Sequence, residues 1–565
     1  TFDGTVNDTG TGIRLFNNGV SAVTFTKTIT GSTGTSPAFS ATGGGTVSAA
    51  ASGSTLTTTT GIALDVRNNT IDNGGLKFQS ISANGAPNGI RLDTTGSSGS
   101  LTVSGTGTAN TGGTIQNTTG HGISLNDTQG VSLTDIRVQN PQHAGIKGAN
   151  VHGFALIDST VTGAGSALTD TTDSSLAFND TSAATPNNLD GVVTVTNNTL
   201  SGAYGGGIDV ANYTGTISNA TISNNTISSS TSPAASKGSG IALNLFGTAS
   251  TVASLTKASI TANTLTNFPS GDGISVQGGN TSGAGAPPGT YGVPSGSVPG
   301  IGANLIDISS NHVTGDATNK LNGAGISASV TGRGQGNFSI TNNGGGGQPI
   351  TNVKAEAIAL GAAGNVNANF LVTGNTAVAN NVLGSSGIGL GTDINQQADL
   401  STNTSDTPVV NANIASNSIA GSSGPGIRVL TRDSSGTTNL RVTNNTVGSP
   451  AQAATAGIRL DAGSSGNALY NPTVCAEVLN NSASTGPSNS FGDVTSGIVL
   501  FKRSASATTY KFGLTGLSPS PATAAQSEAY VAGNNSGSAV GAGFYAGKKA
   551  TVVAGDQFTS CTLGF

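Results

Sequence analysis

The residues of this chain best suited to acid–base chemistry gather in one stretch. Three of the four histidines, His121, His143 and His152, lie there among acidic and basic residues. A histidine, a carboxylate and a lysine held together can exchange protons with a substrate, and paired carboxylates can hydrolyse a glycosidic bond. If the protein is an enzyme, we expect four residues to carry the reaction: Asp93, His121, Asp127 and Lys147.

Acidic and amide side chains also recur directly after a repeated Gly-Ile-x-Leu phrase. Such a column could bind a cation, but Asp and Asn at a strand end more often form turns with their own backbone. We favour the turn. We expect neither a metal ion nor a cofactor, because no metal-binding, phosphate-binding or nucleophile motif stands out. The residues in this position are Asp65, Asp93, Asn126, Asn244 and Asp461.

The composition argues against several classes of protein. Charged residues make up 8% of the chain, glycine accounts for 86 of its 565 residues, and tryptophan and methionine are absent. Because no run of Lys or Arg occurs, we expect no nucleic-acid partner. No apolar stretch is long enough for a membrane-spanning helix. Since the chain starts at Thr1 and lacks methionine, we expect a processed product or a fragment.

Two short phrases alternate along most of the chain and must position these residues. The first reads Gly-Ile-x-Leu or Val, as at 122–125 and 457–460, and the second reads Asn-Asn-Thr-Ile or a variant, as at 68–71 and 224–227. Apolar and polar residues alternate within each phrase, which predicts short strands, and no helical periodicity persists. Repetition at about 20–50 residues is typical of solenoids and propellers.

We predict an all-β fold, a parallel β-helix (β-solenoid) with a C-terminal cap. The alternative is a β-propeller, but the strands are too short for four-stranded blades and tryptophan is absent. In a β-helix Ile, Leu and Val stack inside, while an Asn at a corner can hydrogen-bond to the Asn of the next coil as a ladder. The predicted ladder contains Asn69, Asn198, Asn225, Asn263, Asn311, Asn417 and Asn445.

The chain divides into a long repetitive part and a different end. We expect residues 1–465 to form coils with surface insertions and residues 466–565 to form the last coils and a cap, because a solenoid end exposes core and unpaired backbone. Cys475 and Cys561 both lie in the second part. We expect a disulfide between them, with two unpaired thiols as the alternative. The expected insertions are 164–190, 228–239 and 278–300.

The stretch at 74–136 resembles the large secreted bacterial β-strand-repeat proteins with right-handed parallel β-helix repeats. The C-terminal pattern is similar to theirs too, with a Cys before a Leu-Asn-Asn phrase at 475–481, an IVLFKR strand and a late Cys561. The resemblance implies right-handed coils and a secreted or cell-surface protein, often filamentous or adhesive. The chain more distantly resembles pectate-lyase-like and polygalacturonase enzymes; the Gly-His-Gly at 120–122 is similar to one of their motifs, but their paired aspartates are missing.

We expect a non-catalytic extracellular structural protein, a β-solenoid rod that self-assembles into a filament or acts as a cell-surface adhesin. An uncapped first coil could accept the end of another copy and so extend a filament. The partners would be other copies of the chain or cell-surface and matrix glycans. The alternative is a polysaccharide-binding or polysaccharide-degrading β-helix protein. Glycan binding without hydrolysis would use exposed tyrosines, for which the candidates are Tyr204, Tyr213 and Tyr291.

Overall fold

A computed structural model of the protein consists of two compact units. Unit 1 comprises Thr1–Asn244 and Ala262–Gly271, and unit 2 comprises Leu245–Thr261 and Asp272–Phe565. The fold is all-β, with 53% of residues in strands and 2% in helices, and its strands run parallel, which confirms the predicted parallel β-helix. The structure describes residues 1–182, 186–229, 238–280, 287–382, 384–392, 407–431, 434–463, 471–487, 497–502, 511–536, 545–546 and 558–565.

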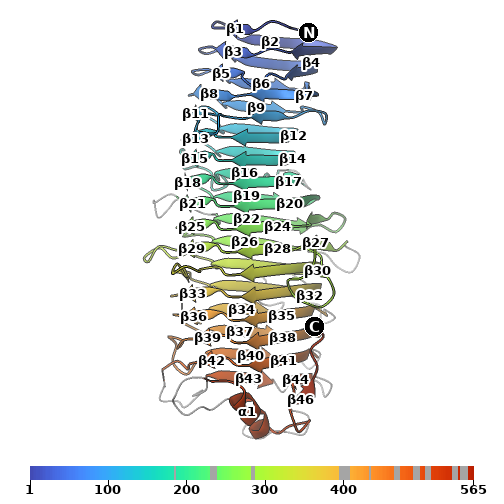
Figure 1. Ribbon diagram of the computed structural model, residues 1–565, viewed down its shortest axis with the longest axis vertical. Helices are drawn as coiled ribbons and strands as arrows, with labels where there is room; N and C mark the ends of the chain where they lie inside the picture. Colours follow the sequence, from blue (N-terminus) through green and yellow to red (C-terminus); the bar gives the residue numbers. More distant parts are fainter. Residues whose placement is uncertain are drawn as a thin grey trace. The chain divides into compact units, whose positions relative to one another are not determined.

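Unit 1 is built from short strands that follow one another in coils, coloured blue to green in Figure 1. Its strands are β1 (Val6–Asp8), β2 (Ile13–Phe25), β3 (Ile29–Ser32), β4 (Phe39–Ala49), β5 (Thr55–Thr57), β6 (Leu64–Arg67), β7 (Thr70–Phe78), β8 (Ser80–Asn84), β9 (Ile90–Asp93), β10 (Leu101–Val103), β11 (Thr114–Gln116), β12 (Ile123–Thr134), β13 (Arg137–Gln139), β14 (Ile146–Ile157), β15 (Thr160–Thr162), β16 (Leu176–Phe178), β17 (Leu189–Thr196), β18 (Thr199–Ala203), β19 (Ile208–Asn212), β20 (Gly215–Ser223), β21 (Thr226–Ser229) and β25 (Thr264–Thr266). The division between the units falls within β22 (Ile241–Gly247).

Unit 2 repeats this arrangement and adds a helix. Its elements are β23 (Ala253–Leu255), β24 (Ala258–Thr261), β26 (Ile274–Asn280), β27 (Gly289–Tyr291), β28 (Ile306–Ser309), β29 (His312–Thr314), β30 (Ile326–Thr341), β31 (Ile350–Thr351), β32 (Ile358–Thr373), β33 (Thr376–Val378), β34 (Ile388–Gly391), β35 (Val409–Ala415), β36 (Ser418–Ala420), β37 (Ile427–Thr431), β38 (Thr437–Thr443), β39 (Thr446–Val447), β40 (Ile458–Ala462), β41 (Thr473–Leu479), β42 (Ser482–Ala483), β43 (Ile498–Lys502), β44 (Lys511–Thr515), α1 (Ala524–Gly533), β45 (Tyr545–Ala546) and β46 (Thr559–Cys561). No helix among the described residues is long and apolar enough to cross a membrane.

Each coil contributes three strand segments, and each segment pairs in parallel with the same segment of the next coil. In unit 1, β12 supplies two segments on either side of a bend and pairs along both with β14, while β13 supplies the third and pairs with β15. Because side chains alternate across a strand, each segment places one apolar set inside. The inward residues of the first segment stand in register and are at most 2% exposed: Ile90, Ile123, Ile146, Leu176 and Ile208.

Steric crowding explains why the Gly-Ile-x-Leu phrase begins with glycine. A Cβ on Gly122 would lie 2.4 Å from a methyl carbon of Val138, and one on Gly207 would lie 2.3 Å from a methyl carbon of Ile227. Val138 and Ile227 are the inward residues of the third segments, so the glycine lets that side chain fill the corner of the core. The glycine of the first phrase and the apolar residue of the third segment therefore pack directly against each other.

The two residues of the Asn-Asn pair have different roles at a corner of the coil: the first turns the backbone and the second makes the buried hydrogen bonds. The first Asn takes the left-handed backbone, as Asn197 (φ 60°) and Asn224 (φ 56°) do, and thereby turns the chain. The second, Asn198 or Asn225, points inside. The Asn198 backbone N–H and side-chain amide both donate to Oδ1 of Asn225, at 3.0 Å each, and the same amide also donates to the Leu156 carbonyl. Every polar atom of the buried side chain is thus satisfied.

This pattern forms an Asn ladder in each unit. In unit 1 it joins Ser159, Asn198, Asn225 and Asn263. In unit 2 it is longer than predicted and joins Asn311, Asn343, Asn375, Asn417, Asn445, Asn481 and Asn535. Of the predicted members only Asn69 stands apart. Its amide donates to the Gly44 carbonyl, and its buried Oδ1 accepts no hydrogen bond from any residue that the structure describes.

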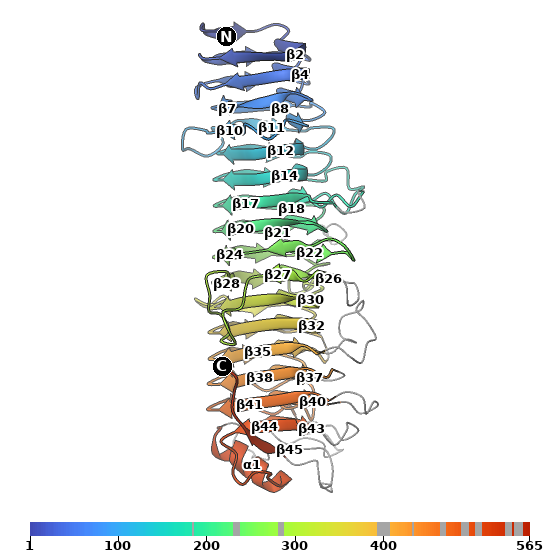
Figure 2. The same ribbon diagram turned by 90° about the vertical axis from the view of Figure 1, so that its right-hand side faces the viewer.

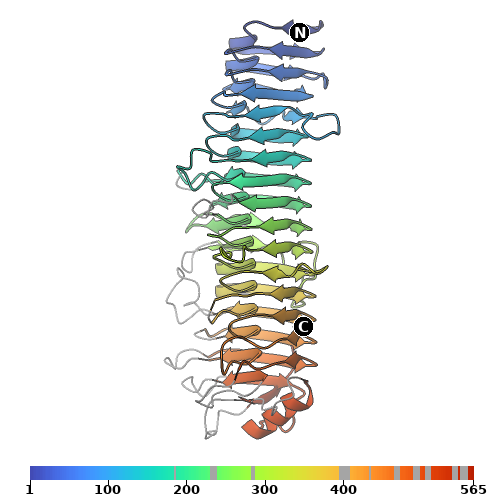
Figure 3. The ribbon, with the colours of Figure 1, turned by 90° about the vertical axis from the view of Figure 1, so that its left-hand side faces the viewer.

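A second column of asparagines lies on an outward side of unit 2, under two covering segments. Asn369, Asn411 and Asn439 stand in register. The Asn411 amide donates to Asn369 Oδ1 at 2.9 Å, and the Asn439 amide donates to Asn411 Oδ1 at 2.8 Å. The insertion after β27 covers one end, where the Asn369 amide donates to the Gly296 carbonyl. The C-terminal segment covers the other end, where the Gly564 N–H donates to Asn439. Figure 3 shows the C-terminus of the chain beside the coils of unit 2.

A cap closes the last coil of unit 2. Helix α1 starts at a capping box formed by Thr523 and Gln526, and the chain after it continues the ladder through Asn535, so the helix lies against the end of the coils (Figure 2). Cys475 and Cys561 form a disulfide, which confirms the predicted pairing and excludes two free thiols. The bridge lies over Gly513, where a Cβ would come within 2.8 Å of the Cys561 sulfur.

Two of the three expected insertions contain strands that the sequence did not reveal. The segment 164–190 holds β16, whose three residues are all buried. The segment 278–300 holds β27, which pairs with β23 and β30 because Tyr291 buries its ring in the core. Most of the third insertion, and parts of the other two, lie outside the described residues.

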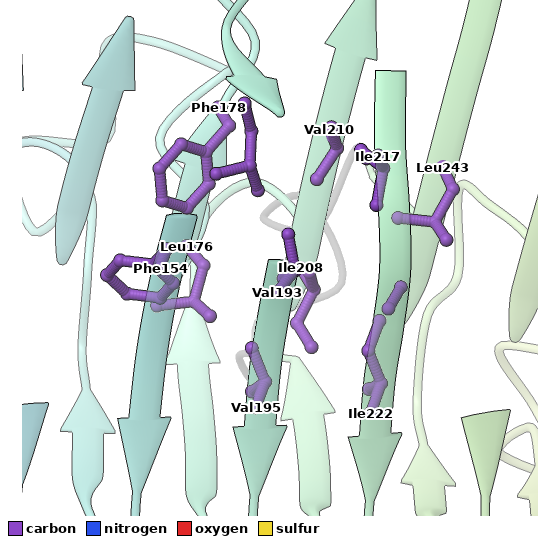
Figure 4. Close-up of a pocket in the computed structure, with 12 residues that line it drawn as sticks. Phe154, Leu176, Phe178, Val193, Val195, Ile208, Val210, Ile217, Ile222 and Leu243 are labelled. Carbon is purple, nitrogen blue, oxygen red and sulfur yellow. The ribbon is translucent and has the colours of Figure 1, made fainter. Parts of the chain in front are cut away.

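The interior of unit 1 contains a small apolar gap among the described residues. Figure 4 shows its lining, in which side chains of successive coils face one another. The gap has a volume of about 10 Å³ and is lined by apolar side chains, so it stays dry. Its lining consists of Phe154, Leu176, Phe178, Leu189, Val193, Val195, Ile208, Val210, Ile217, Ala220, Ile222 and Leu243.

We predict that Asn225→Ala destabilises the protein far more than Asn69→Ala. The first change removes a side chain that makes hydrogen bonds on both sides and leaves buried partners unpaired, which costs about 2–4 kcal/mol. The second removes a single hydrogen bond, to the Gly44 carbonyl, and an oxygen without a partner among the described residues, which costs about 1 kcal/mol or less. Urea unfolding of both variants measures the difference. Equal losses would show that the ladder adds nothing beyond side-chain burial.

We also predict that reduction of Cys475–Cys561 loosens the cap and leaves the coils of unit 1 unchanged. A bridge across 86 residues restricts the unfolded chain by about 4–5 kcal/mol in the loop-entropy view. Hydrogen exchange with and without reductant should accelerate in 511–536 and 558–565 and stay constant in 120–160. Acceleration spread evenly over both regions would contradict a local role for the bridge.

Candidate functional site

The four predicted catalytic residues separate into two groups on unit 1. Lys147 points outward from β14, in register with Ser124 of the coil before, and His121 lies just before β12. Asp93 and Asp127 lie beyond the other end of this segment, where the Asn126 amide donates to Asp93 at 2.8 Å and to Asp127 at 3.2 Å. The structure therefore unites His121 with Lys147 but not with the predicted carboxylates.

His121 and His143 begin a cluster at the corner that precedes β12 and β14. Their ring centroids lie 5.6 Å apart. The Ala144 backbone N–H donates to His121 Nδ1 at 3.2 Å, which assigns the neutral ring's proton to Nε2. His143 Nδ1 lies 3.1 Å from a carboxylate oxygen of Asp173, whose side chain is 4% exposed. Asp173 was not among the predicted site residues.

A second hydrogen-bond chain starts at Lys147 and crosses two coils. Lys147 donates to the side-chain oxygen of Asn179 at 2.7 Å, and the Asn179 amide donates to Asp209 at 2.6 Å. Asp209 occupies the x position of a Gly-Ile-x-Val phrase, as Lys147 nearly does in its own coil. The shared outward position of Lys147 and Asp209 could have indicated in the sequence that they lie in one column. The coil between them carries Ala177 at that position, so the two charged residues do not follow one another in successive phrases.

Burial sets the protonation of this cluster, which we call the His–Lys cluster (His121, His143, Lys147, Asp173, Asp209). Burial and then the nearby Lys147 charge lower the pKa of His121 to about 4, so this imidazole is neutral at neutral pH. Burial also lowers the pKa of Lys147 and raises the pKa values of Asp173 and Asp209. Groups with shifted pKa values gather at functional sites, although structural networks produce the same shifts.

The chemistry open to the His–Lys cluster is hydrogen bonding more than hydrolysis. Glycoside hydrolysis needs one carboxyl group as acid and a second as nucleophile or base. Here Asp173 is engaged by His143 and Asp209 by Asn179. Within the part of the chain that the structure describes, no group of three or more His, Cys, Asp or Glu is placed to hold a metal ion. The cluster offers donors and acceptors to a hydroxyl-rich ligand.

The turn position after the Gly-Ile-x-Leu phrase is only partly uniform. Asp93 and Asn126 stand in register, as predicted. Asp65 does not belong with them, because Leu64 pairs with Ile90 and brings Asp65 opposite Arg91. Its 3%-exposed carboxylate binds Arg91 at 2.9 Å and Arg67 at 3.0 Å, so the side chain is a buried ion-pair partner and not a turn former.

Of the three candidate tyrosines for glycan binding, the structure excludes Tyr291 from the surface. Tyr291 is fully buried, and its hydroxyl donates to backbone carbonyls and accepts from the Gly279 N–H at 2.7 Å. Burial raises the pKa of this phenol. Tyr213 is 37% exposed and Tyr204 is half-buried. Tyr291 had been expected on the surface because it lies in a Gly- and Pro-rich segment.

Comparison with known proteins gives no relative: no family model, curated protein or solved structure matches the chain.

We predict that His121 makes the protein less stable in mild acid. In the unfolded chain a histidine gains its proton near pH 6.5, but folded His121 does so only near pH 4. Between these values the unfolded state binds more protons, so stability falls as pH falls, by up to roughly 3 kcal/mol. Urea unfolding at pH 7 and pH 4.5 should show a smaller loss for His121→Gln than for the unaltered protein.

The comparison between variants is needed because other groups act in the opposite sense. Asp173 and Asp209 have raised pKa values, so they stabilise the folded state as pH falls toward those values. They are present in both proteins and cancel. An unchanged pH dependence in His121→Gln would refute the burial argument.

Proposed function

We propose that this chain is a non-catalytic structural protein of an extracellular surface, a β-helical scaffold that acts as an adhesin. The observation that carries the proposal is the pair of Asn ladders, which bind coil to coil through buried, fully satisfied amides. Such a scaffold holds outward side chains at fixed positions without needing a large core. The Cys475–Cys561 disulfide supports an oxidising compartment.

Adhesion is favoured over self-assembly because one end of unit 2 is closed. Head-to-tail growth requires two open coil ends that accept each other. Helix α1 and the Asn535 corner occupy the place where a further coil would stack on Asn481. A filament built by coil stacking would first have to displace this cap. The proposed partners are cell-surface or matrix glycans.

The competing enzyme function would use the His–Lys cluster. It is less favoured because both cluster carboxylates already hold hydrogen-bond partners inside the protein. It remains testable because His121 and Lys147 do lie together. Replacing either by Ala would abolish any hydrolysis that this cluster performs.

The test uses the purified chain and a panel of insoluble polysaccharides. We expect electron microscopy to show separate particles, co-sedimentation to show retention on at least one polysaccharide, and a reducing-end assay to show no cleavage. Regular filaments would replace adhesion by self-assembly. Release of reducing ends that His121→Ala and Lys147→Ala both abolish would replace it by catalysis, and failure to bind any surface would overturn the adhesive role.

A further inference from the structure

The outer face of unit 2 carries a polar hollow that the proposed scaffold role does not require. The x positions of successive Gly-Ile-x-Leu phrases stand in register across β30, β32, β34, β37, β40 and β43. In order they are Ser327, Ala359, Gly389, Arg428, Arg459 and Val499. The first three of these positions carry small side chains and the next two carry arginine, so the surface is lower over β30, β32 and β34 than over β37 and β40.

Arg428 divides this face into two adjoining hollows. The first, about 140 Å³, is walled by Glu356 and Arg428 and floored by Gly and Ala of β32 and β34. A Cβ on Gly389 would lie 2.9 Å from the Glu356 side chain, so glycine keeps this floor open. The second hollow, about 330 Å³, lies between Arg428, Arg459 and the Gln452–Ala456 segment. We call the two together the Arg428 groove.

The Arg428 groove presents hydrogen-bond donors and acceptors side by side. Arg428 Nη2 donates to Glu356 Oε1 at 2.8 Å, and its Nη1 makes only a long contact of 3.4 Å with the Gly384 carbonyl. A guanidinium has five N–H groups and a carboxylate about four acceptor sites, so both keep unused capacity. Glu356 Oε2 accepts no hydrogen bond from the described residues. Both side chains are partly exposed, at 24% and 19%.

The second arginine extends the same chemistry by one coil. Arg459 Nη2 donates to Asp461 at 2.7 Å, and its guanidinium stacks on the Phe501 ring at 4.6 Å. Parallel strands lie about 4.8 Å apart, so the two guanidinium stems are one strand spacing apart. Their mutual repulsion is offset because each has its own carboxylate. The groove therefore has polar groups of both signs and little net charge.

From these observations we infer that the Arg428 groove binds an uncharged oligosaccharide. Each sugar hydroxyl both donates and accepts, which matches a guanidinium beside a carboxylate. Because Glu356 and Asp461 balance the charges of Arg428 and Arg459, the groove offers an acidic sugar no net electrostatic attraction. The in-register column from Ser327 to Val499 covers five strand intervals, roughly 24 Å, which suits several sugar rings in a row. The inference deepens the adhesive role proposed above and rests on it, by naming the partner's chemistry.

The test measures calorimetric binding of soluble hexasaccharides to the full chain. The uncharged probes are cellohexaose, mannohexaose and chitohexaose, and the acidic probe is hexagalacturonate. Ala359→Phe fills the first hollow from its floor, and Arg428→Gln removes the central charge but keeps an amide donor. We expect at least one uncharged probe to bind, with at least tenfold weaker binding in each variant. Thr194→Phe, at an outward position of β17 in unit 1 and outside the His–Lys cluster, should bind as the unaltered protein does.

The outcomes separate this inference from the adhesive role. Binding of only the acidic probe, binding of no soluble probe, or equal binding by all variants would overturn the groove assignment. If the variants bind the soluble probe as the unaltered protein does and also keep its retention on insoluble polysaccharide, adhesion stands and the groove falls. If the soluble probe binds in the groove but no surface retains the chain, the groove stands and adhesion falls. Matching urea midpoints for the variants and the unaltered protein exclude misfolding as the cause.

Discussion

The hydrogen bond from one coil to the next is the interaction on which the rest of this structure depends. A coil of about thirty residues has too little apolar surface to fold alone, so its stability comes from its neighbours. Along the strands the backbone makes these bonds, but at corners the backbone turns away and leaves buried groups to satisfy. The Asn side chain restores them there: Asn225 accepts from Asn198 and donates to Asn263.

The sequence predicts this architecture well because the constraint is local and repeated. The alternation of apolar residues, the glycine before each Ile and the paired Asn each report one coil, and together they define the coil. The ladder members at Asn343, Asn375, Asn481 and Asn535 were missed because the residue two positions later is alanine or glycine, whereas the predicted members have Ile, Leu or Val there. Asn69 was included for the same local reason, although the coils beside it carry no Asn at its corner.

The sites are harder to predict because they depend on register between coils. Asp209 binds into the His–Lys cluster only because two coils bring it toward Lys147, with Asn179 between them. Arg428 reaches Glu356 across a whole coil, and the distance along the chain is 72 residues. Insertions of unequal length separate such partners in the sequence. The spacing that would indicate a site is therefore absent from the chain and appears only when the coils are aligned.

The ladder also keeps the same hydrogen-bond geometry between coils whose chain lengths differ. Successive ladder residues lie 27, 38 or 54 positions apart, yet their amides meet at 2.9–3.0 Å in each case. Unequal recombination between two copies of the repeated phrase would thus add or delete an entire coil. The coils on either side of the change would still stack on each other through matching ladder residues. Genes of this kind can change in length by recombination while the protein keeps its cross-section, so the number of coils is a quantity that selection can adjust.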